Sequence, residues 1–384
     1  MLKSRLIGIV DEPDMTRSVV FDEMSRVFLR NVTMSAYVAP MKSRACLVGL
    51  AIVASGCVDR GHAAGVREVE PFTLPADPPP RHVEGGRRVD APVVLIAIDG
   101  VRWQEVFEGT DWSLSNAPPV SAGSLVPTLN ALGRERGAFV GAPGQGTISA
   151  SGPNYVSLPG YTEMLGGRPS RCTDNDCART ELPSLLDEAR AAGAKVAAFA
   201  SWEKLDLAAT STPGGFYSSC GRNGDRAIDP WPGVGDYRPD RMTAEAALAY
   251  YEAEQPDVFF LGLGDPDEYA HRGDYLAYLA AVHRADAIVG RLLGVLNRLG
   301  ERGRNTHVVV TADHGRAHDF NDHGPMPEAA RVWMVASGPR FLARGAIAST
   351  RPRHLADIAP TLRLVLGLPP DTSERSGMPI EELF

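Results

Sequence analysis

Short apolar runs of strand length constrain the fold of this chain more than any other feature. Residues 92–98 read Pro-Val-Val-Leu-Ile-Ala-Ile, and similar runs occur at 195–200, 258–262, 307–311 and 332–336. Polar residues do not alternate with apolar ones inside these runs. That pattern indicates strands buried on both faces, as in a parallel sheet.

Helical patterns lie between these runs. Residues 182–192 carry leucines and alanines on one helical face, 275–299 repeats apolar residues at the same spacing, and 360–366 begins a third helix. Strands that alternate with helices predict an α/β fold, with a doubly wound, mostly parallel central sheet and helices on both of its faces. Ligands of such sheets bind outside the carboxyl ends of the strands.

Acidic groups and a histidine follow three of the predicted strands. Asp99 follows the first run, Asp267 lies just beyond the third, and Asp313 and His314 follow the fourth. One such group is routine, because Asp often caps the next helix. Three strands that end in this way predict a site at one edge of the sheet.

The spacing of these groups is typical of metal ligands. Asp267 and His271 are four residues apart, so a helical turn places them on one face. His314 is adjacent to Asp313, and His323 lies in the turn-like sequence Asn-Asp-His-Gly-Pro. Carboxylate oxygen together with imidazole nitrogen suits zinc, with manganese or iron as alternatives.

These motifs, in this order, resemble the alkaline phosphatase superfamily, nearest its nucleotide pyrophosphatase/phosphodiesterase branch. The similarity runs from about Val93 to Leu368. A single motif is a weak signal, whereas several in the right order and at plausible spacing are a strong one. The matching segments are Asp99-Gly-Val-Arg, Ser157 to Gly167, Asp267 with His271, Asp313-His-Gly, His323-Gly, Gly338-Pro and Asp357-Ile-Ala-Pro-Thr.

The resemblance implies a metal-dependent phosphoric ester hydrolase with two divalent ions, zinc above other metals. One ion would be held by Asp267, His271 and His323. The other would be held by Asp99, Asp313 and His314, together with the oxygen of Ser157.

Ser157 is the nucleophile that the resemblance implies. A serine hydroxyl is a poor nucleophile at neutral pH, and coordination to a divalent ion lowers its pKa. Ser157 would also begin a helix, where free N–H groups favour an anion. The implied reaction is attack on phosphorus, a covalent phospho-enzyme and then hydrolysis by water. Ser151 is the rival nucleophile, although its distance to Gly167 fits the motif less well.

Three further residues are candidate substrate contacts. Asn175 lies eighteen residues after Ser157, and in the similar branch an Asn near this position binds a phosphoryl oxygen. Arg316 and His318 follow the Asp-His-Gly motif, where they are candidates to contact the substrate anion.

The chain divides into four segments by composition. A basic start at Lys42 and Arg44, an uncharged run at 45–56 and then Cys57 resemble a bacterial signal peptide with a lipoprotein box. We expect an exported protein, periplasmic or anchored in a bacterial membrane through a lipid on Cys57. The expected segments are 1–40, a non-native upstream extension; 41–57, signal peptide and lipobox; 58–90, a Pro-rich linker; and 91–384, the hydrolase domain.

Cysteine usage agrees with export. Cys172 and Cys177 bracket a polar loop, where a small disulfide is reasonable in an oxidising compartment. Cys220 is either free or paired with one of these two. The sequence leaves the connectivity open.

Charge and hydropathy exclude other classes of protein. Lys and Arg number 39 against 47 Asp and Glu, a net charge of −8, so binding to nucleic acid polymers is not expected. No apolar run reaches about eighteen residues, which excludes a conventional membrane span.

The favoured function is hydrolysis of small phosphate esters, with diesters above monoesters. The alternatives are a phosphomonoesterase, a sulfatase or a phosphoalcohol transferase of the same superfamily, and a non-catalytic surface lipoprotein. A sulfatase needs an Arg four residues after its nucleophile, where this chain has Tyr161. A binding protein has no need of a metal-bound nucleophile. The substrate itself and the oligomeric state stay open.

Overall fold

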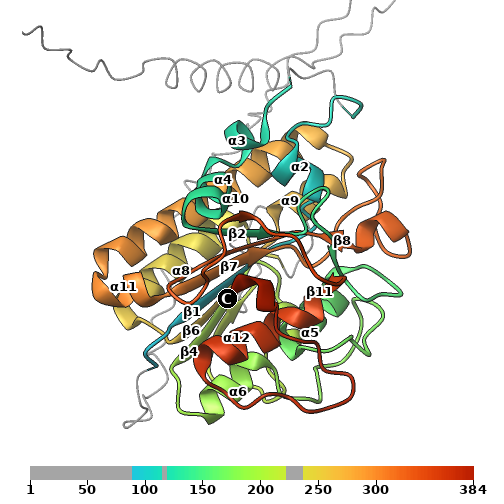
Figure 1. Ribbon diagram of the computed structural model, residues 1–384. Helices are drawn as coiled ribbons and strands as arrows, with labels where there is room; N and C mark the ends of the chain where they lie inside the picture. The colour runs from blue at the N-terminus through green and yellow to red at the C-terminus, as the bar shows by residue number, and fades with distance from the viewer. Residues whose placement is uncertain (1–88, 115–118, 222–236) are drawn as a thin grey trace, which may run out of the picture. The chain divides into compact units, whose positions relative to one another are not determined.

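The computed structural model describes residues 89–114, 119–221 and 237–384 (Figure 1). The predicted upstream extension, the signal peptide with Cys57 and nearly all of the 58–90 linker lie outside these residues. Those assignments therefore stay predictions.

One eight-stranded sheet forms the centre of the described domain. Among the described strands of this sheet, only Met334–Ser337 runs antiparallel to both of its neighbours, and the other pairs are parallel. The expectation of a mostly parallel α/β sheet is confirmed. The strands follow in the order β10 (Gly345–Ala346), β2 (Gly137–Val140), β9 (Met334–Ser337), β7 (His307–Thr311), β1 (Val93–Ile98), β6 (Val258–Leu263), β4 (Val196–Ala200) and β5 (Tyr217–Cys220).

The middle of the sheet is formed by β1 between β6 and β7. Val93 pairs with Val258 on one side and with His307 on the other. All six residues of β1 are buried, because helices cover both faces and leave no side for polar residues. The apolar run seen in the sequence is therefore a direct consequence of its central place.

Helices pack on the two faces of this sheet. Figure 1 shows α8, α10 and α11 on one side and α5, α6 and α12 on the other, and α10 packs against both α8 and α11, while α12 packs against both α5 and α6. The helices are α2 (Trp103–Phe107), α3 (Ala122–Leu125), α4 (Pro127–Ala131), α5 (Ser157–Gly166), α6 (Leu185–Ala191), α7 (Leu205–Ala209), α8 (Asp240–Glu254), α9 (Asp265–Ala270), α10 (Tyr275–Arg298), α11 (Glu301–Asn305) and α12 (Ile358–Leu366).

Two helix starts differ from the sequence prediction for local reasons. The helix expected from residue 182 begins at Leu185, because the Ser184 hydroxyl accepts hydrogen bonds from the N–H groups of Leu186 and Asp187 and so caps it. Helix α12 begins at Ile358, two residues before the expected Pro360. Proline is tolerated in the first turn of a helix, so it does not mark the start.

The run at 332–336 is not one strand, and that prediction is wrong in detail. Its first residue belongs to β8 (Arg331–Val332), in a small sheet with β3 (Ile148–Ser149) and β11 (Arg353–His354), whereas β9 starts at Met334. Trp333 separates them. Its carbonyl accepts a hydrogen bond from the Thr311 hydroxyl at 2.6 Å, and its indole N–H donates to the Val101 carbonyl at 3.0 Å.

The cysteine connectivity left open by the sequence is resolved for the described residues. Cys172 and Cys177 form a disulfide, and Cys220 is a buried free thiol at the end of β5. None of the described helices has the length and apolar character needed to cross a membrane.

Candidate metal centre

The predicted ligands come together at the carboxyl ends of three neighbouring parallel strands. Asp99 directly follows β1, Asp313 lies two residues beyond β7, and α9, which carries Asp267, begins just after β6. Parallel strands bring residues distant in sequence to the same sheet edge. The edge expected to hold a site is therefore the edge where these side chains meet.

Asp99, Asp313 and His314 form the first group of possible ligands. Their ligand atoms all lie within 4.8 Å of one another, and all three residues are buried. The His314 Nε2 atom is 3.3 Å from Asp99 Oδ1 and 3.4 Å from Asp313 Oδ2. This is the set that the resemblance assigns to one ion.

The second group contains Asp267, His314 and His323, whose ligand atoms also lie within 4.8 Å of one another. His271 adjoins it: its Nε2 is 2.8 Å from Asp267 Oδ2 and 3.3 Å from His323 Nε2. The rings of His314 and His323 stack with their centres 4.4 Å apart. His314 thus lies between the two groups, and His271 is on the side of the second group that is open to solvent.

The electrostatics of this cluster fit divalent cations. Burial, and then the neighbouring charge of Asp99, raise the pKa of Asp313 well above its usual value. Burial lowers the pKa of His314, but the carboxylates of Asp313, Asp267 and Asp99 outweigh burial and raise it to about 10. Asp313 Oδ2 is buried and accepts no hydrogen bond. Buried carboxylates at this density need positive charge to compensate them, and oxygen with nitrogen donors suits divalent metals.

Gly100 allows the β1 turn to pass close to the second group. Its φ of +63° is a left-handed value that glycine adopts without strain, and its N–H donates to Asp313 Oδ1 at 3.1 Å. A Cβ atom at this position would lie 2.2 Å from Asp267 Oδ1. The residue after Asp99 must therefore be glycine for both carboxylates to keep their places.

Ser157 is the first residue of α5, with its hydroxyl inside the first group. Its Oγ donates to Asp99 Oδ1 at 3.3 Å and lies 3.4 Å from His314 Nε2. The rival Ser151 is used elsewhere: its hydroxyl donates to Glu163 Oε1 at 2.7 Å. The structure thus places Ser157, and not Ser151, among the predicted ligands.

Asn175 lies against the same helix end. Its Oδ1 accepts a hydrogen bond from the Leu158 N–H at 2.9 Å. This N–H belongs to the first turn of α5, where backbone donors have no partner within the helix. The structure therefore brings Asn175 beside the residue that follows Ser157.

Arg316 and His318, the other candidate substrate contacts, are placed differently. Arg316 is buried, and its guanidinium donates to an Asp267 carboxylate oxygen and to the carbonyls of Phe320 and Asn321. The His318 side chain is 82% exposed, with its ring nitrogen 3.9 Å from Glu328. Arg316 is thus an orienting partner of a predicted ligand, and His318 is not brought into the cluster.

Sequence reasoning did not assign a role to Tyr161 in the cluster. It lies four residues after Ser157, on the same face of α5, and is fully buried. Burial, and then the charges of Asp99 and Asp313, raise its pKa well above the usual value. Its spacing from Ser157 was the available signal for this placement.

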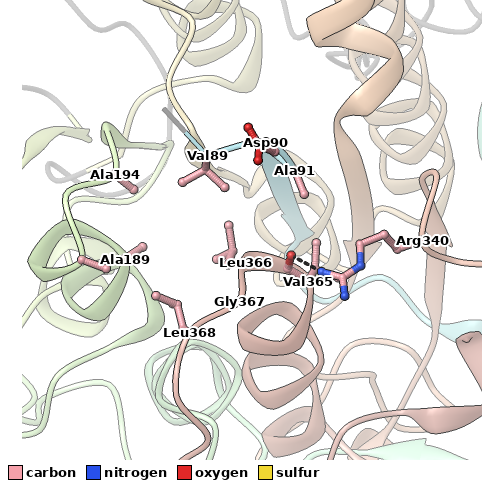
Figure 2. A pocket seen from close by; sticks show the side chains of 11 residues that line it. Val89, Asp90, Ala91, Ala189, Ala194, Arg340, Val365, Leu366, Gly367 and Leu368 are labelled. Carbon is pink, nitrogen blue, oxygen red and sulfur yellow. Dashed lines mark hydrogen bonds between the residues drawn. The ribbon is translucent and has the colours of Figure 1, made fainter. Parts of the chain in front are cut away.

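A separate cavity of about 420 Å³ lies at the amino end of β1 (Figure 2). It is lined by the residues before β1, by α6 and by the end of α12, and the Arg340 guanidinium at its edge donates to the Val365 carbonyl at 2.7 Å. None of the predicted ligands lines it. The chemistry of the predicted metal ligands therefore does not depend on this cavity.

Comparison with known proteins bears on the family of this chain. Residues 234–370 match the family model described as the Metalloenzyme superfamily. The matched segment includes Asp267, His271, Asp313, His314 and His323, so five of the six predicted ligands lie within it.

A curated relative of this chain is the 2,3-bisphosphoglycerate-independent phosphoglycerate mutase of Desulforudis audaxviator. It is 33% identical over 151 residues, which cover 38% of this chain and 28% of the mutase. The chain thus spans little more than a quarter of that relative's length.

Solved structures similar to this chain include BT1596, a 2-O GAG sulfatase. Its TM-score is 0.54 at 16% identity, covering 77% of this chain and 73% of that one. Murine ectonucleotide pyrophosphatase/phosphodiesterase 5 has a TM-score of 0.51 at 13% identity, covering 74% and 97%. These similarities show the fold. The resemblance to the alkaline phosphatase superfamily is confirmed, and members of that superfamily are metal-dependent hydrolases or phosphotransferases.

Proposed function

We propose that this protein is a two-metal hydrolase of small phosphate esters that uses Ser157 as nucleophile and favours diesters. One observation carries the proposal. Ser157 is the first residue of α5. Its hydroxyl lies within 3.4 Å of both Asp99 Oδ1 and His314 Nε2, inside a buried group of possible metal ligands.

Two divalent ions, with zinc favoured, complete the proposed site. Asp99, Asp313 and His314 would hold one, and Asp267, His271 and His323 the other. Asp313 Oδ2, which is buried and accepts no hydrogen bond, supports this assignment. When bound, such ions supply Lewis-acid stabilisation and lower the pKa of a coordinated hydroxyl.

The chain's own residues then have distinct parts in the reaction. Ser157 Oγ forms the new bond to phosphorus as the bond to one alcohol of the diester breaks. Water later cleaves the bond between Ser157 Oγ and phosphorus and releases a phosphate monoester. Asn175 is proposed to bind a non-bridging phosphoryl oxygen. Because its Oδ1 accepts from the Leu158 N–H, its amide NH₂ group is left for that oxygen.

The charge around the site supports diesters over monoesters. A diester carries one negative charge and a monoester up to two, so a monoesterase needs more positive charge. Arg316 and Lys204 contact predicted site residues, and both are already engaged: Arg316 by Asp267 and two carbonyls, Lys204 by Asn175 O and Asp176 Oδ1.

Phosphoryl transfer to an alcohol is the second candidate. The mutase relative supports it, because the acceptor would then be a hydroxyl in place of water. Sulfate ester hydrolysis is not favoured, since Tyr161 supplies a neutral buried phenol where that class needs an Arg.

We also propose that the protein is exported, with a signal peptide at 41–57 and a lipid on Cys57. The Cys172–Cys177 disulfide supports an oxidising compartment. Fractionation of cells that express the full chain, with wild type compared with Cys57→Ser, tests both points. Export predicts a shortened chain in the envelope fraction, and lipidation predicts release of the variant from the membrane.

A hydrolysis assay tests the proposed reaction. The full chain, supplied with zinc, is given bis-p-nitrophenyl phosphate, p-nitrophenyl phosphate and p-nitrophenyl sulfate. We expect the diester to react fastest, Ser157→Ala to lose at least ~10³-fold in kcat, and the matched control Ser151→Ala to retain activity. A Ser157→Ala protein as active as wild type, or cleavage of the sulfate alone, would contradict the mechanism. Added glycerol distinguishes transfer from hydrolysis, because only transfer converts the diester into glycerol p-nitrophenyl phosphate.

A further inference from the structure

We infer that Lys204 and the Cys172–Cys177 disulfide are positioning elements for Asn175, and that they act on the reaction through this one side chain. The inference rests on the proposed function, since it assumes that Asn175 meets the phosphoryl group. It adds two elements to the proposed site, Lys204 and the disulfide-closed loop, and neither supplies a metal ligand.

Asn175 projects from a short loop that the disulfide closes. The loop runs from Cys172 to Cys177, six residues in all. Thr173, Asp174 and Asp176 are exposed, whereas Asn175 is half-buried against the first turn of α5. The loop is therefore a surface segment in which Asn175 turns inward.

Lys204 ties this loop to the frame of the sheet. It follows β4 and immediately precedes α7, which packs against α5. Its Nζ donates to the Asn175 carbonyl at 2.8 Å and to Asp176 Oδ1 at 3.0 Å, and it lies 5.7 Å from the centre of the Trp202 ring. One ammonium group thus fixes both the backbone of Asn175 and the residue after it.

A third tie comes from the segment that precedes α5. The Asn154 amide donates to the Thr173 carbonyl at 2.7 Å. The loop is therefore held on one flank by Asn154 and on the other by Lys204, and the disulfide joins its ends. Asn175 lies between these ties, directly over the Leu158 N–H.

For a residue such as Asn175, which is proposed to orient the phosphoryl group, the exact position of the side chain determines the reaction rate. A displacement of about 1 Å in a group that orients a reacting centre costs up to ~10²-fold in rate. Within the loop itself, the Asp176 N–H donates to Asp174 Oδ1 at 2.8 Å, which shapes the turn without fixing it on α5. A crosslink restricts the conformations that a loop can adopt. Lys204 then favours the conformation in which Asn175 accepts from the Leu158 N–H.

A double-mutant cycle with the full chain and zinc tests the inference. We expect Asn175→Ala to lower kcat for the diester by ~10²-fold and Lys204→Met to lower it by ~10-fold. The double variant should be no slower than Asn175→Ala alone, because Lys204 acts through Asn175. Lys204→Arg should recover most of the loss, since its guanidinium also donates to two acceptors.

Lys195→Met is the matched control. Lys195 directly precedes the same strand β4 at its other end, and its Nζ is likewise engaged, at 2.6 Å from Glu254 Oε2 and 2.6 Å from the Glu254 carbonyl. We expect it to leave kcat unchanged. Cys172→Ser with Cys177→Ser should behave as Lys204→Met does, with a loss that disappears in the Asn175→Ala background.

Hydrogen exchange of the Leu158 amide gives a readout that needs no metal and no substrate. Its protection comes from Asn175, because this amide has no partner within the helix. We expect exchange at Leu158 to be ~10-fold faster in Lys204→Met and in the double cysteine variant, and unchanged in Lys195→Met.

Several results overturn the inference. They are losses for Lys204→Met and Asn175→Ala that multiply, an Asn175→Ala protein as active as wild type, or a Leu158 amide that exchanges at the wild-type rate in both loop variants. Failure of the proposed function looks different, because Ser157→Ala would then match wild type or no ester would be cleaved, while the exchange result would still stand.

Discussion

Substitution of Gly100 by Ala tests the geometry of the metal centre. The added Cβ would lie 2.2 Å from Asp267 Oδ1 and 3.0 Å from Arg316 Nη1. Ordinary carbon contacts begin at about 3.5 Å, so the Asp267 carboxylate must move by about 1 Å. It would then leave its contacts with His271 and Arg316.

Gly100→Ala combines the cost of backbone strain with the cost of displacing Asp267. A substitution at a second glycine measures the backbone strain alone. Gly100 has a φ of +63°, where a side chain costs about 1–2 kcal/mol of unfolding free energy. Gly144 has a φ of +76° with nothing within 4 Å of its Cβ position, so Gly144→Ala bears the backbone cost alone. The difference between the two variants is the cost of moving Asp267.

The assays are denaturant unfolding of the metal-free protein and zinc binding by competition with a chromophoric chelator. We expect Gly144→Ala to lose about 1–2 kcal/mol and to bind zinc as wild type does. Gly100→Ala should lose more, and its weaker zinc site should bind ~10- to 100-fold less tightly. If Gly100→Ala bound zinc with wild-type affinity at both sites, Asp267 would not be a ligand in the arrangement described.

Three further predictions follow from single side chains. Arg316→Met should destabilise the metal-free protein by about 3–5 kcal/mol, because it removes the buried guanidinium from the buried Asp267 carboxylate. Added zinc should restore part of this loss, and an unchanged denaturation midpoint without metal would contradict the prediction. Burial raises the pKa of Glu163 to about 7 from 4.5, so its contribution to stability is full below pH 4.5 and is lost as the pH rises through about 7. The free energy of unfolding of Glu163→Gln, measured at several pH values, should not fall over this range. If it falls as in wild type, another group causes the pH dependence. Removal of divalent ions with a chelator should abolish ester cleavage and zinc should restore it, with a metal-independent rate as the refuting result.

Much of the fold could be predicted because burial on both faces leaves a clear signature. The all-apolar run at 92–98 became β1, and the residues after β1, β6 and β7 met at one edge. The carboxyl ends of neighbouring parallel strands lie at one edge of the sheet, so the sequence alone could predict that Asp99 and Asp313 are close together. The break at Trp333 could not, because it depends on hydrogen bonds to Thr311 and Val101 that only the packed structure supplies.

The side chains that support the ligands were harder to predict. Arg316 follows the Asp-His-Gly motif, and its neighbours in sequence suggest an exposed anion contact, yet its guanidinium reaches Asp267, 49 residues away. Lys204 lies in a stretch with no motif. Its hydrogen bond to the Asn175 carbonyl depends on how the disulfide loop packs against α5. The spacing of residues along the chain does not predict that packing.

The burial of Cys220 has a consequence for how this protein acquires its crosslink. Burial raises the pKa of its thiol to about 12, and disulfide exchange proceeds through the thiolate. In the folded domain Cys220 therefore cannot attack the Cys172–Cys177 bond at an appreciable rate. Disulfides that involve Cys220 can therefore form only while the chain is unfolded. Once the domain has folded around Cys220, the Cys172–Cys177 disulfide is protected from exchange with it.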